Sequence, residues 1–146
     1  MAIILDGSLA AASIRTEIAE AVKSSVAKGN RPPGLVAILV GEDGASQTYV
    51  GAKKTACDEV GFAGDVRRFA ADISEEDLLA EIEKINSDET IDGLIVQLPL
   101  PKHISEEKVT QAILPGKDVD GFHDINMGKL AKGDETGVKP ATPYGI

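Results

Sequence analysis

The stretch Leu35-Val-Ala-Ile-Leu-Val40 is an unbroken apolar run of strand length. Such a run, without polar alternation, is typical of a strand in a parallel sheet that is covered on both faces. Segments with helical periodicity flank it at residues 8–28 and from about residue 46 to 60, and Gly29 and Gly61 are placed to end them. A buried strand between two helices predicts an α/β fold.

Strand and helix patterns alternate along the rest of the chain. Shorter apolar runs predict strands at residues 3–5, 66–69 and 93–98. Two more helices are predicted, one opened by a capping box at Ser74–Asp77 and one over residues 105–113. The order βαβαβαβα predicts a three-layer α/β/α domain with a mostly parallel sheet and right-handed crossovers.

The last 26 residues follow a different pattern. From Gly121 the apolar pattern thins, and Gly, Lys and Asp accumulate up to Lys139. Thr142 and Pro143 favour a helix start, with Thr142 as the cap and Pro143 in the first turn. A helix that starts so close to the end predicts a truncated chain, with a frayed tail as the alternative.

The composition argues against several classes of function. The 146 residues include 15 Lys and Arg against 24 Asp and Glu, a net charge of −9, and they contain two Tyr, three Phe and no Trp. These numbers disfavour nucleic-acid binding. Cys57 is the single cysteine, and His103 and His123 have no third ligand in register, so no metal site is expected. Without an 18-residue apolar stretch or a basic N-terminus, we expect a cytoplasmic protein with no signal peptide and no contact with membranes.

The second predicted helix carries a lysine on its apolar face. At 100° per residue, the following residues share an arc of about 120°: Tyr49, Val50, Lys53, Ala56, Cys57 and Val60. Lys54 lies outside this arc and is expected to point to water. A buried lysine must be paired or lose its proton more easily than in water. The alternative is that its stem packs while the ammonium reaches solvent. Tyr49, one turn earlier, would place a phenol beside the amine.

Two polar sites follow the predicted strands. Gln97 interrupts the apolar run at the carboxyl end of a strand expected to be central, which is where open parallel sheets bind ligands. Its amide could orient a lysine or a heterocycle, or simply cap loop backbone. Pro99 turns the chain away there and is expected to leave an opening. Asp118 and Asp120 precede a turn at Gly121; such acids either accept hydrogen bonds from a ring with adjacent N–H donors or are solvated.

Six segments together resemble the bifunctional methylenetetrahydrofolate dehydrogenase/methenyltetrahydrofolate cyclohydrolase family. They are residues 40–46, 49–62, 92–101, 117–122, 126–130 and 140–145. The most specific are Q-L-P-L-P at 97–101 and K-D-V-D-G at 117–121. The chain has Ala141 where the family commonly has Cys.

The resemblance implies roles for individual residues. Lys53 corresponds to the catalytic lysine, and Gln97 corresponds to the glutamine that contacts this lysine and the substrate. Tyr49 corresponds to the tyrosine that stacks near the folate ring, and Asp120 to the aspartate that binds the amino-pyrimidine edge of the pterin. Two further substrate-binding positions are implied: Ser46 and Leu98.

The resemblance also implies an activity in one-carbon metabolism and purine biosynthesis. The family oxidises 5,10-methylenetetrahydrofolate to 5,10-methenyltetrahydrofolate with NADP and hydrolyses the product to 10-formyltetrahydrofolate. The hydrolysis needs a base near the cationic carbon, and a Lys53 with a lowered pKa would fit. Family members are longer and form homodimers. Residues 1–146 would therefore be the N-terminal folate-side domain, and NADP would bind mainly to an absent C-terminal half, so we expect no dehydrogenase activity from this chain alone.

Two other classes of function stay open. One is a non-catalytic folate-binding or regulatory module. The other is a short-chain-dehydrogenase-like enzyme, suggested only by Tyr49 and Lys53 at Y-x-x-x-K spacing and disfavoured because no G-x-G-x-x-G occurs in the sequence.

Overall fold

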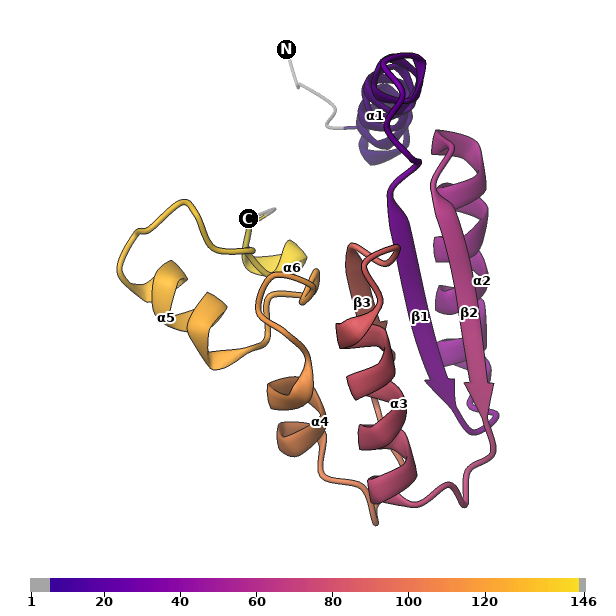
Figure 1. The fold of residues 1–146 in the computed structure, drawn as a ribbon, viewed down its shortest axis with the longest axis vertical. Coiled ribbons are helices and arrows are strands. Elements are labelled where there is room, and N and C mark those ends of the chain that lie inside the picture. Colours follow the sequence, from indigo (N-terminus) through magenta and orange to yellow (C-terminus); the bar gives the residue numbers. More distant parts are fainter. Residues whose placement is uncertain (1–5, 145–146) are drawn as a thin grey trace.

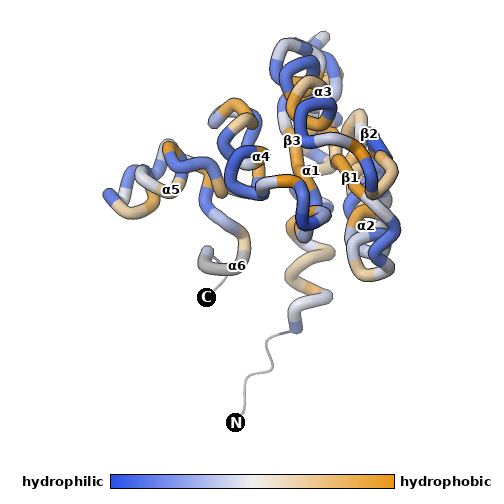
Figure 2. The backbone as a smooth tube through the Cα atoms, turned by 90° about the horizontal axis from the view of Figure 1, so that it is seen from below, coloured by the Kyte–Doolittle hydropathy of each residue, from blue (hydrophilic) through white to orange (hydrophobic). Residues whose placement is uncertain are grey.

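The central apolar run forms the middle strand of a parallel sheet in the computed structural model, which describes residues 6–144 (Figure 1). The elements in chain order are α1 (Gly7–Ala27), β1 (Gly34–Val40), α2 (Gly44–Val60), β2 (Ala63–Phe69), α3 (Glu75–Ser87), β3 (Gly93–Val96), α4 (Glu106–Ala112), α5 (Asp124–Ala131) and α6 (Ala141–Tyr144). Helix α2 lies on one side of the sheet and α3 and α4 lie on the other (Figures 1 and 2). The predicted three-layer α/β/α class is confirmed.

The sheet has the strand order β2-β1-β3, and both pairings are parallel. The expectation that the strand before Gln97 is central is therefore wrong for the described sheet, because β3 pairs with β1 alone. An apolar run shows that a strand is covered but not where it lies in the strand order. The free side of β3 is covered by the segment 117–119, whose Lys117 carbonyl accepts a hydrogen bond from the Leu94 amide at 2.7 Å. The strand expected at residues 3–5 lies outside the described residues.

Apolar side chains fill both spaces between the layers. Alternate residues of β1 point to opposite faces. Ala37 and Leu39 meet Val50 of α2, whereas Val36, Ile38 and Val40 join the larger core under α3 and α4. That core also contains Leu78, Ile82, Ile85, Ile91, Leu94, Val96, Leu100, Ile104, Val109 and Ile113. Figure 2 shows the hydrophobic colour along β1 and β3, between the helical layers.

Local signals place most helix ends as predicted. Ser74 caps α3 by accepting a hydrogen bond from the Asp77 amide at 3.0 Å, and Gly61 ends α2 at φ 81°. Helix α5 was not predicted, because it is short and its cap is a histidine, His123. The last helix begins at Ala141, so the expected cap at Thr142 is wrong.

The first helix differs from the others because most of its apolar residues are exposed. Only Val22 is buried, and it lies beside Gly61 at the end of α2. The remaining large aliphatic residues of the stripe are between 37% and 70% exposed: Leu9, Ile14, Ile18 and Val26. Within residues 6–144, no helix combines the length and apolar character needed to cross a membrane.

Candidate functional site

Two predicted site residues are in contact: Lys53 comes from α2, and Gln97 directly follows β3. The Lys53 Nζ donates a hydrogen bond to Gln97 Oε1 at 3.0 Å. The Gln97 Nε2 donates to the Leu98 carbonyl at 2.8 Å, and the Gln97 backbone amide donates to the Ile38 carbonyl at 2.9 Å. Both ends of the Gln97 amide are therefore used, and its oxygen is fixed toward the lysine.

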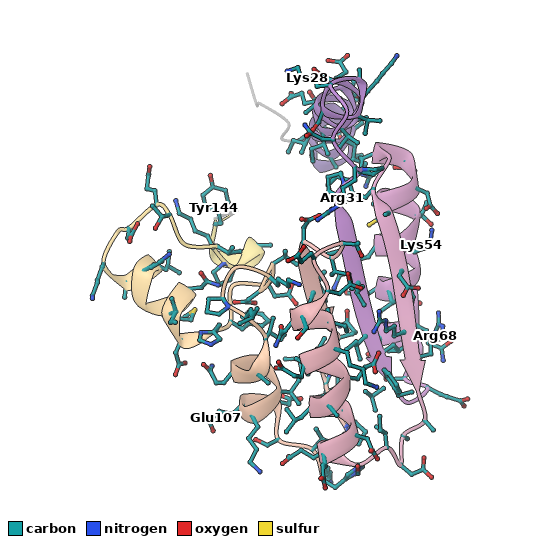
Figure 3. All side chains as sticks on the ribbon, in the orientation of Figure 1. Lys28, Arg31, Lys54, Arg68, Glu107 and Tyr144 are labelled. Atoms are coloured by element: carbon teal, nitrogen blue, oxygen red, sulfur yellow. The ribbon has the colours of Figure 1, made fainter. Side chains whose placement is uncertain are left out.

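Helix α2 positions the lysine. Asp43 caps the helix by accepting a hydrogen bond from the Ser46 amide at 2.8 Å, and the buried Val50 and Cys57 anchor it to the sheet. Lys53 lies on the same side and is partly buried. Its neighbour Lys54 (Figure 3) is also partly buried, because its stem lies beside Gly64 of β2, but its ammonium pairs with Asp58. The two adjacent lysines therefore differ in their partners, Gln97 and Asp58, and not in their burial class, so the expectation that Lys54 points to water is wrong for its stem.

The side of α2 that packs on the sheet contains the buried residues Val50 and Cys57, and Tyr49 lies at the edge of this side. Its side chain is 63% exposed, and the expectation that it belongs to a buried face is wrong. Ser46 is 4% exposed, two helical turns before Lys53. Leu98 is partly buried and packs against the core under α3 and α4. Of these three residues, only Leu98 has a hydrogen-bonded link to Gln97.

Asp120 is the half-buried acid of the cluster, in the loop between α4 and α5. Burial raises the pKa of its carboxyl group. The positive charge of Lys53 opposes this effect, and the negative charge of Asp118 adds to it. An acid held in this way can accept hydrogen bonds from a ligand that brings its own N–H donors.

Asp118 and Asp120 have different environments, although the sequence presents them as a pair. Asp118 is 2% exposed, and protein N–H groups already occupy its carboxylate. It accepts hydrogen bonds from the amides of Gly121 at 3.0 Å and His123 at 2.9 Å, and from Asn126 Nδ2 at 2.9 Å. Sequence reasoning missed Asn126, whose one signal was its place in the matching segment 126–130.

The site therefore joins an amine, an amide and a carboxyl group from three segments. The amide orients the amine, the amine can transfer a proton, and the carboxylate can bind paired N–H donors. Within the part of the chain that the structure describes, no group of three or more His, Cys, Asp or Glu residues is placed to hold a metal ion.

A family model and curated relatives all point to the same protein family. The family model described as "Tetrahydrofolate dehydrogenase/cyclohydrolase, catalytic domain" matches residues 5–120. The chain is 50% identical to the bifunctional protein FolD of Porphyromonas gingivalis over 143 residues, which is 98% of this chain and 48% of that protein. It is also 50% identical to FolD of Aquifex aeolicus over 146 residues, which is 100% of this chain and 50% of that protein.

Solved structures share the fold. The bifunctional FolD of Campylobacter jejuni matches with a TM-score of 0.95 and 43% identity, over 98% of this chain and 50% of that chain. The Trypanosoma brucei methylenetetrahydrofolate dehydrogenase-cyclohydrolase, complexed with NADP cofactor and inhibitor, matches with a TM-score of 0.84 and 35% identity, over 88% and 44%. The chain spans about half the length of the curated relatives that it matches.

Proposed function

The chain belongs to the tetrahydrofolate dehydrogenase/cyclohydrolase family, and from this we propose that it forms the folate-binding catalytic side of a bifunctional enzyme. The enzyme oxidises 5,10-methylenetetrahydrofolate and hydrolyses the resulting 5,10-methenyl cation to 10-formyltetrahydrofolate. The observation that carries the proposal is the 3.0 Å hydrogen bond between Lys53 Nζ and Gln97 Oε1. Asp120 lies close enough for its charge to interact with that of Lys53.

Lys53 handles the proton in the hydrolysis. When water adds to the methenyl carbon, a new C–O bond forms and one water proton passes to Lys53 Nζ, which accepts it with its lone pair. The ring then opens as the C–N bond breaks, while the hydroxyl proton of the adduct moves to the departing nitrogen. Because Lys53 donates an N–H to Gln97 Oε1, the amide holds the amine in place without using its lone pair.

Asp120 binds the substrate. Its carboxylate accepts the adjacent N–H donors of the amino-pyrimidine edge, a charge-assisted pair that fixes the ring relative to Lys53. Tyr49, which is largely exposed, stacks against the bound ring, and Leu98 contacts it beside Gln97. A substrate contact from the buried Ser46 stays a prediction.

The dehydrogenase step requires NADP, which accepts the hydride. The strand-to-helix turns of this sheet do not fit the cofactor's phosphates, because acidic side chains occupy the helix N-termini where anions bind. Asp43 caps α2, and the first turns of α3 and α4 contain Glu75, Glu76, Asp77, Glu106 and Glu107. We therefore assign the phosphate site to a dinucleotide-binding domain outside this chain, and we expect no dehydrogenase activity from residues 1–146 alone.

Membership of the family supports a place in one-carbon metabolism. We propose a cytoplasmic, homodimeric enzyme of one-carbon metabolism whose formyl product feeds purine biosynthesis. Sedimentation of the complete protein that carries this sequence checks the dimer.

The substitution Lys53→Met in that complete protein tests the chemistry. We expect the cyclohydrolase kcat to fall by about 10²-fold or more, because a general base contributes this much. Lys54→Met is the matched control, since Lys54 lies on the same helix and pairs with Asp58, whereas Lys53 is bonded to Gln97. It should leave the rate unchanged.

Folate binding, measured by calorimetry, separates the alternatives. Binding by the unsubstituted protein without turnover would favour a non-catalytic module. Near-normal turnover of Lys53→Met would rule out the role of the lysine.

A further inference from the structure

Asn126 of α5 is a buried amide that joins three segments. It is 2% exposed, and each end of its side chain has partners in other parts of the chain. Its Nδ2 donates to the Pro115 carbonyl at 3.0 Å and to Asp118 Oδ2 at 2.9 Å, and its Oδ1 accepts from the Val138 amide at 3.2 Å. These bonds link the segment before the site loop, the loop itself and the segment that precedes α6.

The loop that carries Asp120 is held by hydrogen bonds on both sides of that residue. Asp118 anchors the ends, because its carboxylate accepts hydrogen bonds from the Gly121 and His123 amides while it is bound by Asn126. Between these anchors, Val119 is 40% exposed, and the half-buried Asp120 lies close enough to Lys53 for their charges to interact. The position of Asp120 therefore depends on how firmly Asp118 is held.

The segment 138–140 supports the same turn from behind. Gly121 has φ +72°, and a Cβ there would lie 2.8 Å from the Val138 carbonyl and 3.0 Å from Pro140. The amide of the same residue, Val138, donates a hydrogen bond to Asn126 Oδ1, so Asn126 also holds the segment that packs against this turn. The turn is thus held between two segments that Asn126 connects.

We propose that Asn126 is a positioning residue for substrate binding, acting through Asp118 to fix the carboxylate of Asp120 at the distance that the ring edge of a folate requires. The inference rests on the proposed function and deepens it. Asn126 does not touch the substrate and takes no part in the proton transfer at Lys53. It therefore governs substrate affinity, whereas Lys53 and Gln97 govern turnover.

The test is Asn126→Ala in the complete protein, with cyclohydrolase kinetics as the readout. We expect KM for the methenyl substrate to rise about tenfold, the size of one lost hydrogen bond to a charged group, with kcat within about twofold of its normal value. Asp118→Asn keeps the side-chain volume and should raise KM in the same way. It serves as the test if Asn126→Ala fails to fold.

Asn86 provides the matched control. It is also a buried asparagine with both ends bonded, since it donates to the Ala112 carbonyl at 2.8 Å and accepts from the Leu114 amide at 3.1 Å. Among the described residues, no hydrogen bond joins its side chain to Asp118 or to the Asp120 turn, and its backbone carbonyl, which accepts from Lys117 Nζ at 2.8 Å, is kept in the alanine variant. Asn86→Ala should lower stability to urea without changing KM.

The pH profile adds a readout that a merely structural role would not move. Binding requires the ionised Asp120, so affinity falls on the acid side. Loosening the turn exposes Asp120 to water and removes the burial that raises its pKa, while the neighbouring charges of Lys53 and Asp118 remain. The acid limb of 1/KM should therefore move to lower pH in Asn126→Ala.

Two outcomes would overturn the inference: an unchanged KM in both variants, or equal KM increases in Asn126→Ala and Asn86→Ala. Failure of the proposed function is distinguishable, because the unsubstituted protein would then not turn over the methenyl substrate.

Discussion

Helices α1 and α2 both carry an apolar stripe, yet only α2 buries the core of its stripe. Val50 of α2 is completely buried, whereas Ile14 of α1 is 56% exposed. Helix α2 is the crossover between β1 and β2, so the sheet covers its inner side. Helix α1 precedes the sheet and contacts α2. Periodicity identifies residues that share a face; the connection of the helix to a sheet decides whether that face is covered.

The largest expected effect separates the two helices directly. Val50→Ala removes two methyl groups from a closed site against Ala37 and Leu39, and should cost about 2 kcal/mol of unfolding free energy. Ile14→Ala should change it by less than about 0.5 kcal/mol, because the side chain is exposed and Ala is the better helix former. Urea unfolding of both variants checks this. Equal losses would mean that the stripe of α1 is also covered.

A smaller, pH-dependent effect is expected where the chain passes from α1 to β1. Arg31 lies at this junction (Figure 3) and donates two hydrogen bonds to Asp92, at 2.6 and 2.8 Å, and Gly34 donates a third at 2.8 Å. These bonds lower the pKa of Asp92 from 3.8 to about 2. The folded state therefore gains stability when Asp92 is ionised. This gain is complete above about pH 4 and is lost as the pH falls through 2.

Asp92→Asn should accordingly destabilise the chain at pH 7 by less than Val50→Ala does, since the pair is half-exposed. The gap between the variant and the original chain should close as the pH approaches 2. Urea unfolding across this range is the measurement. A gap that is the same at every pH would show that the charge of Asp92 contributes nothing.

The smallest effect is expected at the direct link between the two helices. Arg15 of α1 and Glu59 of α2 approach to 3.4 Å, and both side chains are 51% exposed. Arg15→Ala should change the unfolding free energy by less than about 0.5 kcal/mol, as is usual for exposed ion pairs. A larger loss that disappears in high salt would show that this pair holds α1 in place.

The candidate site was predictable to a different degree at each residue. Helical spacing placed Lys53 on the apolar side of its helix, and the position of Gln97 after an apolar strand made it a candidate either to orient a lysine or ligand or to cap loop backbone. Their 3.0 Å contact joins residues 44 positions apart, a pairing that helical spacing does not supply. Asn126 was missed because its three partners lie in segments that only the folded chain brings together.

The sequence by itself determined the layers. Unbroken apolar runs, helical periodicity and local caps are short-range signals, so β1, α2 and α3 follow from the residues that compose them. Only the tertiary structure decided that β3 pairs with β1 alone and that α1 exposes most of its apolar residues. It also decided that Asp118 is bound by backbone amides, while Asp120 is half-buried within reach of the charge of Lys53. The order of the strands, the covering of a helix face and the burial of a side chain all depend on contacts between distant segments. They are therefore decided only when the whole chain packs.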